Sequence, residues 1–227
     1  VISEEWRTRR NAGFRVRNQI MPVLLKDSKY AQRDVIGDLN IIKNFKYQTL
    51  RDYYHKWYRP DLQAIAVVGD FDVDQMEKKV KELFSKIPTP VNPAKRENFT
   101  VNPHDEIYFV CATDKELTQS SVSVYIKYPA PTKEEKNHQY MKNGILQSFY
   151  NTMLGQRVSE LLQKGNPPFI SAQAGFGGNI VRGWNTYIIS TTAKPNEEAG
   201  ALEAIYRENE RVKKFGFTEG ELERAKT

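Results

Sequence analysis

The feature that most constrains the fold is a helix followed directly by a short apolar segment, between residues 47 and 70. In YQTLRDYYHKWYRP, apolar side chains recur at i, i+3, i+4, i+7 and i+8, which predicts a helix with one buried face. Pro60 ends this helix, and the run AIAVVGD then predicts a buried strand. A helix and a strand that each bury one face require a layered fold.

The rest of the chain continues the alternation of strands and helices. DVDQMEKKVKELFSKIP predicts a helix, IYFVCA and SVSVYIKYP predict strands, and a long helical stretch begins at Gln139. Two further strands, near AQAGFGGN and in NTYIISTTAKP, precede a helix, and Thr218 with Glu221 forms a capping-box pattern that starts the next one. Strands thus come in runs with helices between the runs, which favours an α+β fold with largely antiparallel sheets.

A proline-rich stretch, IPTPVNPAKREN, divides the chain because it has no apolar periodicity. We place a linker at 89–98, the C-terminal part of a first domain at 1–88, and a second domain, truncated at its C-terminus, at 99–227. The chain opens with VISEEW inside a predicted helix and stops inside the helix that follows Thr218. We therefore expect it to be an internal piece of a longer protein.

Composition excludes several functional classes. The net charge is +6, but Lys and Arg are mixed with Glu, as in EKKVKEL, which is typical of solvated helix faces rather than of a nucleic-acid site. No apolar run approaches the roughly 20 residues that a membrane span needs. We predict neither a nucleic-acid partner nor a membrane span.

The residues that most often bind metals or act as nucleophiles are sparse. Cys111, the single cysteine, lies in the predicted strand IYFVCA, so we expect a small buried core residue. His55, His104 and His138 are far apart and show neither H-x-x-H nor H-x-x-x-H spacing. The sequence therefore contains no self-contained histidine metal site.

The segment LRDYYHKWYRPDLQAIAVVGDFD resembles part of the M16 zinc metallopeptidases, the group of insulinase, pitrilysin and the mitochondrial processing peptidase. VISEEW and YAQRDVIGDLNIIKNF are similar to the region after the metal-binding helix of that family, and GQRVSELLQK and FGFTEGELERAK to the domain that follows. The WYRP…VVGD block is the most specific part. The resemblance implies M16 peptidase-like (LuxS/metallohydrolase-like) α+β domains, each an antiparallel sheet with helices on one face, that enclose a chamber for extended peptides.

The resemblance also implies a zinc site. In the family, two His of an inverted H-x-x-E-H motif and a downstream Glu bind the metal, which activates a water molecule for peptide hydrolysis. VISEE aligns with the end of the downstream motif, which makes Glu5 the candidate metal ligand; Glu4, about 100° away on a helix, would point elsewhere. The alternative is that both carboxylates only stabilise a helix N-terminus.

The chain lacks other parts of the family's catalytic machinery. It contains no H-x-x-E-H, so no catalytic residue is assigned, and the chain alone is expected to be inactive and to bind no zinc. The Arg and Tyr with which the family holds substrate would fall on Gln163 and Ile170, so the substrate-binding residues are unknown. Arg157, at the start of that motif, is interpreted as a helix-surface or structural residue. The strand near AQAGFGGN is a candidate site for edge pairing with a peptide.

Two main hypotheses for the parent protein follow from the resemblance. The first is a zinc-dependent endopeptidase or oligopeptidase whose partner is a peptide or unfolded protein, with this piece packed against the remaining M16 domains. Because bacterial relatives are often exported, we expect the periplasm or cell envelope. The alternative is a non-catalytic M16-like scaffold or peptide-binding protein, with a degraded upstream H-x-x-E-H. A freestanding interaction module is a third hypothesis.

Overall fold

The computed structural model describes residues 1–163 and 165–226, and the chain separates into two compact units. The first unit contains Val1–Thr8 and Asp34–Asn98, and the second contains Arg9–Arg33 and the described residues from Phe99 onward. Residues 9–33 were expected with the first domain but lie in the second unit. The boundaries of the M16 domains in the parent protein stay a prediction.

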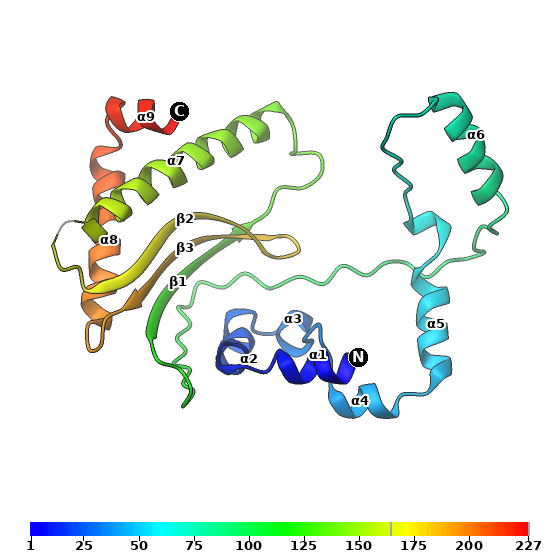
Figure 1. Ribbon diagram of the computed structural model, residues 1–227, viewed down its shortest axis with the longest axis horizontal. Helices are drawn as coiled ribbons and strands as arrows, with labels where there is room; N and C mark the ends of the chain where they lie inside the picture. The colour runs from blue at the N-terminus through cyan, green and yellow to red at the C-terminus, as the bar shows by residue number, and fades with distance from the viewer. Residues whose placement is uncertain (164, 227) are drawn as a thin grey trace. The chain divides into compact units, whose positions relative to one another are not determined.

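The first unit is built from short helices joined by turns (Figure 1). Its elements are α1 (Ile2–Thr8), α4 (Leu39–Asn44), α5 (Tyr47–Trp57), the 3₁₀ turn η1 (Pro60–Leu62) and α6 (Val73–Phe84). Asp38 and Asp72 cap α4 and α6, because their carboxylates accept hydrogen bonds from backbone N–H groups of the first turn. The helix predicted at α5 is confirmed, but its expected buried face is not, because Leu50, Tyr53 and Tyr54 are each more than half exposed. Among the described residues, no apolar side chain of this unit is buried.

The strand predicted at AIAVVGD is wrong for this structure. Residues 64–69 contain no strand, and Val68 is almost fully exposed. A strand requires a neighbouring strand to satisfy its backbone N–H and C=O groups. No strand of the described chain runs beside this segment, so it stays irregular although its composition is typical of a strand.

The second unit contains an antiparallel sheet formed by β1 (Ser120–Pro129), β2 (Phe169–Val181) and β3 (Trp184–Ala193). The strand order is β1-β3-β2, so β3 pairs with both of the other strands. A two-residue turn at Arg182 and Gly183 joins β2 to β3, and Gly183 takes a positive φ of 85°. The predicted α+β class with antiparallel strands is confirmed.

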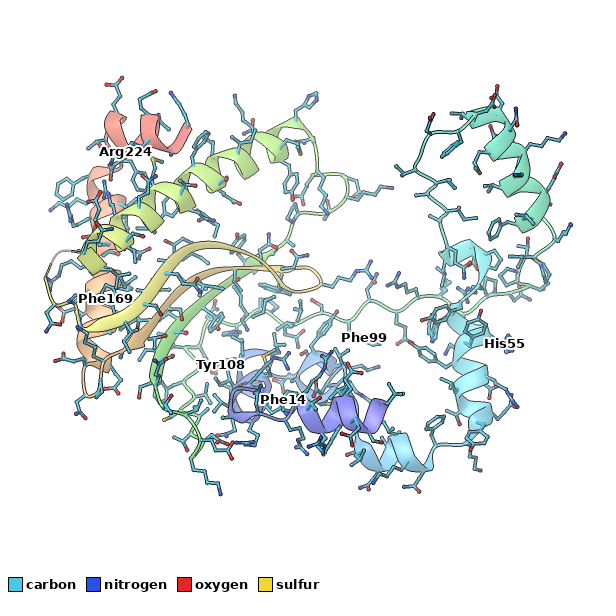
Figure 2. All side chains as sticks on the ribbon, viewed as in Figure 1. Phe14, His55, Phe99, Tyr108, Phe169 and Arg224 are labelled. Carbon is cyan, nitrogen blue, oxygen red and sulfur yellow. The ribbon has the colours of Figure 1, made fainter. Side chains whose placement is uncertain are left out.

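Helices cover one face of this sheet (Figure 1). They are α7 (His138–Gln163) and α8 (Glu198–Phe215), whereas α9 (Glu219–Lys226) packs against α7. The same unit includes α2 (Ala12–Leu24) and α3 (Lys29–Gln32). The hydrophobic core lies between the sheet, α7 and α8, and its buried members include Val158, Phe169, Ile189 and Ile205. Figure 2 labels Phe169 at the start of β2. No helix in the described ranges has the length and apolar character that a membrane crossing requires.

The strand predicted at IYFVCA is also wrong, and so is the expected burial of Cys111. Residues 107–112 form no strand, the side chains of Ile107 and Phe109 are largely exposed, and Cys111 is exposed. The physical reason is again a missing partner, because β1, β2 and β3 pair only with one another among the described residues. Apolar composition indicates that a segment can form a strand, but it does not supply the neighbouring strand.

Charged and polar contacts tie α2 to the loop that follows this segment. The guanidinium of Arg15 donates to both carboxylate oxygens of Asp114, at 2.6 and 2.8 Å, and to Glu116. Gln19 donates to the carbonyl of Thr113 at 3.0 Å. The ion pair with Arg15 lowers the pKa of Asp114 to about 2. These contacts explain why residues 9–33 belong to the second unit.

Candidate functional site

The predicted metal ligand, Glu5, lies on α1 next to Glu4, in the first turn of the helix. The side chain of Glu4 forms an ion pair with Arg7, with 2.9 Å between Oε2 and Nη2. Both carboxylates are near the positive end of the helix dipole, where negative charge is favourable. The position fits the structural alternative as well as ligation, so the assignment of Glu5 stays a prediction.

The residues present do not form a zinc site by themselves. In the described ranges, no three His, Cys, Asp or Glu side chains are grouped so that they could hold a metal ion. His104 stacks on Tyr108 with 4.1 Å between ring centroids, and His55 lies on the exposed side of α5. A structural or catalytic zinc ion requires three or four such ligands. A single carboxylate on α1 therefore does not fit a complete site.

A different feature, the outer edge of β2, presents backbone groups. β2 pairs with β3 on one side, and the described chain contains no strand on its other side. On that outer side the N–H of Phe176 donates to Asn151 Oδ1 at 2.8 Å, and Asn151 Nδ2 donates to the carbonyl of Phe176 at 2.9 Å. Asn151 comes from α7, so a helix side chain occupies one position of the sheet edge.

Gly175 makes room for this amide. Its φ is +153°, and a Cβ atom at this position would lie 2.4 Å from Asn151 Oδ1. Real Cβ atoms essentially never approach a heavy atom so closely, so either the amide would move or the strand would shift. The glycine in AQAGFGGN is therefore explained by a close contact with α7 as well as by its backbone conformation.

An aromatic cluster packs beneath the same edge. Tyr150 of α7 contacts the rings of Phe176, Tyr187 and Phe217 in edge-to-face geometry, with centroids 5.2 to 6.2 Å apart. The hydroxyls of Tyr150 and Tyr187 are 2.8 Å apart, and Tyr187 also donates to Asn209. Burial and the neighbouring Tyr150 raise the pKa of Tyr187. The cluster fixes the α7 turn that carries Asn151.

Arg157, interpreted from sequence as a helix-surface or structural residue, is mostly buried and joins α7 to the start of α9. Its Nε and Nη2 donate to the two carboxylate oxygens of Glu221, and Nη2 also donates to the carbonyl of Gly216 at 3.0 Å. Glu221 in turn accepts from the N–H of Thr218 at 2.7 Å and from its hydroxyl at 2.9 Å, which confirms the predicted capping box. The hydrogen bonds from Arg157, and then those from Thr218, hold the pKa of Glu221 at about 2.

A hollow of about 580 Å³ is bordered by Asn151 and Gly155 of α7 and by Arg224 of α9. Figure 2 labels Arg224. The residues that border it include no histidine or cysteine, and the hydroxyl of Ser159 donates to the carbonyl of Gly155. A serine engaged in this way, with no base beside it, is not arranged for nucleophilic catalysis. The hollow offers polar contacts but no reactive group.

Sequence comparison decides the family. The family model described as "Peptidase M16 inactive domain" matches residues 44–227, most of the chain. The chain belongs to the M16 peptidase family. This confirms the resemblance seen in the WYRP…VVGD block. The match extends across the proposed linker at 89–98, so it leaves the domain boundaries open.

Relatives of this M16 chain are named zinc proteases. The chain is 25% identical over 227 residues to the "Probable zinc protease PqqL" of Escherichia coli K12, covering 100% of the chain and 24% of the relative. It is 29% identical over 171 residues to the "Zinc protease PQQL-like" of Arabidopsis thaliana, covering 75% of the chain and 18% of the relative. The chain spans about a quarter or less of the length of these relatives.

A solved structure shares the fold of this M16 chain. The first half of the periplasmic protease PqqL from Escherichia coli matches with a TM-score of 0.83 at 23% identity, covering 99% of the chain and 47% of that structure. At this identity the match shows the fold. Of the residues singled out from sequence, Glu5 lies on α1 and Arg157 forms an ion pair. Asn151 was not identified from the sequence.

Proposed function

We propose that this M16 chain is part of a zinc-dependent endopeptidase or oligopeptidase that hydrolyses peptides in a closed chamber. The observation that carries the proposal is the family match over residues 44–227, together with relatives named zinc proteases. In this proposal the chain supplies chamber wall and one metal ligand, Glu5, and the remaining ligands come from a preceding H-x-x-E-H segment. Peptides or unfolded proteins are the substrates.

The part of the chain after residue 98 has a binding role in this proposal. The description of the matched domain as inactive, and the lack of any three-residue metal cluster in the described ranges, favour binding over catalysis for these residues. The outer edge of β2 supports a substrate contact, because an extended peptide can add to an open edge through backbone hydrogen bonds. The other M16 domains of the parent protein cover the apolar faces that this chain leaves exposed.

The periplasm is the compartment that we propose. The solved structure with the same fold is described as a periplasmic protease, and the relationship of the chain to PqqL extends over all 227 residues. A non-catalytic M16-like scaffold remains the alternative function. The two differ in whether the complete protein binds zinc and cleaves peptides.

The experiment is a paired measurement on the complete protein of bound zinc and of hydrolysis of a quenched fluorescent peptide library. Glu5→Gln removes the proposed ligand charge, and Glu4→Gln is the matched control one residue away on the same turn of α1. Loss of zinc and activity in Glu5→Gln alone supports the proposal. A complete protein that binds no zinc and cleaves no peptide would establish the scaffold instead.

A further inference from the structure

The side chain of Asn151 substitutes for a peptide unit on the edge of β2. A primary amide carries one carbonyl acceptor and an N–H donor, the same groups that a neighbouring strand would offer. Both are used on one residue, since Phe176 donates to Oδ1 at 2.8 Å and accepts from Nδ2 at 2.9 Å. The outward backbone N–H and C=O of Phe176 are therefore already hydrogen-bonded by a side chain of the same protein.

The register shows which other edge positions face outward. β2 and β3 pair without interruption from Ser171 to Gly177. In an antiparallel pair, residues alternate between exchanging both backbone hydrogen bonds and exchanging none. Because Phe176 turns both of its backbone groups toward Asn151, the residues two and four positions earlier, Ala174 and Ala172, also turn theirs toward the outer edge.

These two positions lie open next to the filled one. Among the described residues, no backbone hydrogen bond to Ala172 or Ala174 comes from outside the sheet. Between Ser171 and Gly177, β2 contains no charged residue, no proline and no register shift, which are features with which natural proteins protect an exposed edge. Pairing there would depend on backbone groups alone and would therefore tolerate varied sequences, which suits an extended peptide.

We infer that Asn151 is a positioning residue that ends the peptide-binding edge of β2, so that a bound peptide pairs with Ala172 and Ala174 but not with Phe176. The inference rests on the proposed function, because it takes the bound strand to be a peptide substrate. Asn151 limits how far a peptide extends along β2. Gly175 is the accompanying requirement, since a Cβ atom there would displace the amide.

Residue-resolved hydrogen exchange on the complete protein tests this directly. The probe is a peptide of alternating Thr and Ser, about ten residues long to match the upper range of strand length. EDTA is present so that the peptide is not cleaved. In the wild type, the peptide is expected to slow exchange of the Ala172 and Ala174 amides about fivefold, as one added hydrogen bond would. The Phe176 amide should be slow already and should not change.

The variants Asn151→Ala and Asn151→Ser remove the amide from Phe176, so that the backbone groups of Phe176 also become available to a peptide. Without peptide, the Phe176 amide should exchange fast in both, and the peptide should now slow it as well. Two variants are used so that a folding defect in one does not decide the outcome. Asn143→Ala is the matched control, because Asn143 lies on α7 and its side chain contacts Gln139 rather than the sheet. Its exchange pattern should equal that of the wild type.

Three results would overturn the inference. The first is fast exchange of the Phe176 amide in the wild type. The second is that the peptide does not slow exchange of the Ala172 and Ala174 amides. The third is that the peptide does not slow exchange of the Phe176 amide in either folded Asn151 variant. Zinc content and peptide cleavage, measured without EDTA on the same preparations, report on the proposed function separately. If the protein binds zinc and cleaves peptides but the exchange of the Ala172 and Ala174 amides does not change with peptide, the role of Asn151 is contradicted and the peptidase proposal is not.

Discussion

Arg157 on α7 and Glu221 on α9 form a two-point ion pair in which both carboxylate oxygens accept from the guanidinium. Both side chains are mostly buried, at 15% and 10% exposure. Glu221 also caps its own helix through Thr218, so one carboxylate fixes both the start of α9 and its contact with α7. This pair holds the helix that follows the Gly216 turn.

Glu221→Gln should therefore destabilise the second unit. The amide cannot accept from Arg157 at both oxygens, and the guanidinium loses its partner in a mostly buried position. We expect the free energy of unfolding to fall by about 2 kcal/mol, measured by urea unfolding. Glu223→Gln, which removes an exposed carboxylate on the same helix, should change it by less than about 0.5 kcal/mol. Equal effects of the two substitutions would contradict the role of the pair.

The same pair predicts how stability depends on pH. Folding lowers the pKa of Glu221 from its ordinary value of 4.5 to about 2, so the ionised form is favoured in the folded state. Its contribution to stability is complete above pH 4.5 and is lost as pH falls toward 2. The stability difference between wild type and Glu221→Gln should shrink over this range. A difference that stays constant from pH 6 to pH 2.5 would exclude the mechanism.

A double-mutant cycle tests the contact between Gly175 and Asn151. Gly175→Ala places Cβ against Oδ1 of the amide and requires an unfavourable φ, so it should cost about 2 kcal/mol. In an Asn151→Ala background the clash is absent, and the same substitution should cost less. Gly178→Ala, with no atom near the added Cβ, is the control. Strict additivity of the two substitutions would argue against the contact.

The accessible thiol of Cys111 gives a simple test of the irregular segment at 107–112. Because Cys111 is exposed and lies in no strand, an Ellman-type reagent should label the 227-residue chain without denaturant, at the rate of an accessible thiol. Cys111→Ser should abolish the signal. Labelling that requires unfolding would show that the segment is buried, as its composition suggested.

Local sequence signals predicted the local structure well. The amphipathic pattern of α5 and the capping box of Thr218 and Glu221 depend on residues within one or two turns, and both are present in the structure. The strands expected at AIAVVGD and IYFVCA failed because strand formation depends on a partner distant in sequence. Periodicity reports which faces can be buried but not which neighbour is available.

The candidate site shows the same division. The resemblance pointed to Glu5, whose role depends on residues that the chain does not contain, so the structure could not test it. Asn151 was invisible to sequence reasoning, because its partner Phe176 lies 25 residues away and a helix asparagine has no distinctive pattern. The one available signal was Gly175 in an otherwise strand-like segment, which often marks close approach by another group.

The most direct test of the central proposal is the zinc content of the complete protein with Glu5→Gln against Glu4→Gln. Removing one of three protein ligands from a zinc site weakens binding strongly, whereas changing a neighbour that points away does not. The account predicts one zinc ion per wild-type chain, retention in Glu4→Gln, and loss of both zinc and peptide cleavage in Glu5→Gln. Zinc and cleavage that survive Glu5→Gln would contradict the assignment of Glu5, and a wild type without either would contradict the peptidase proposal.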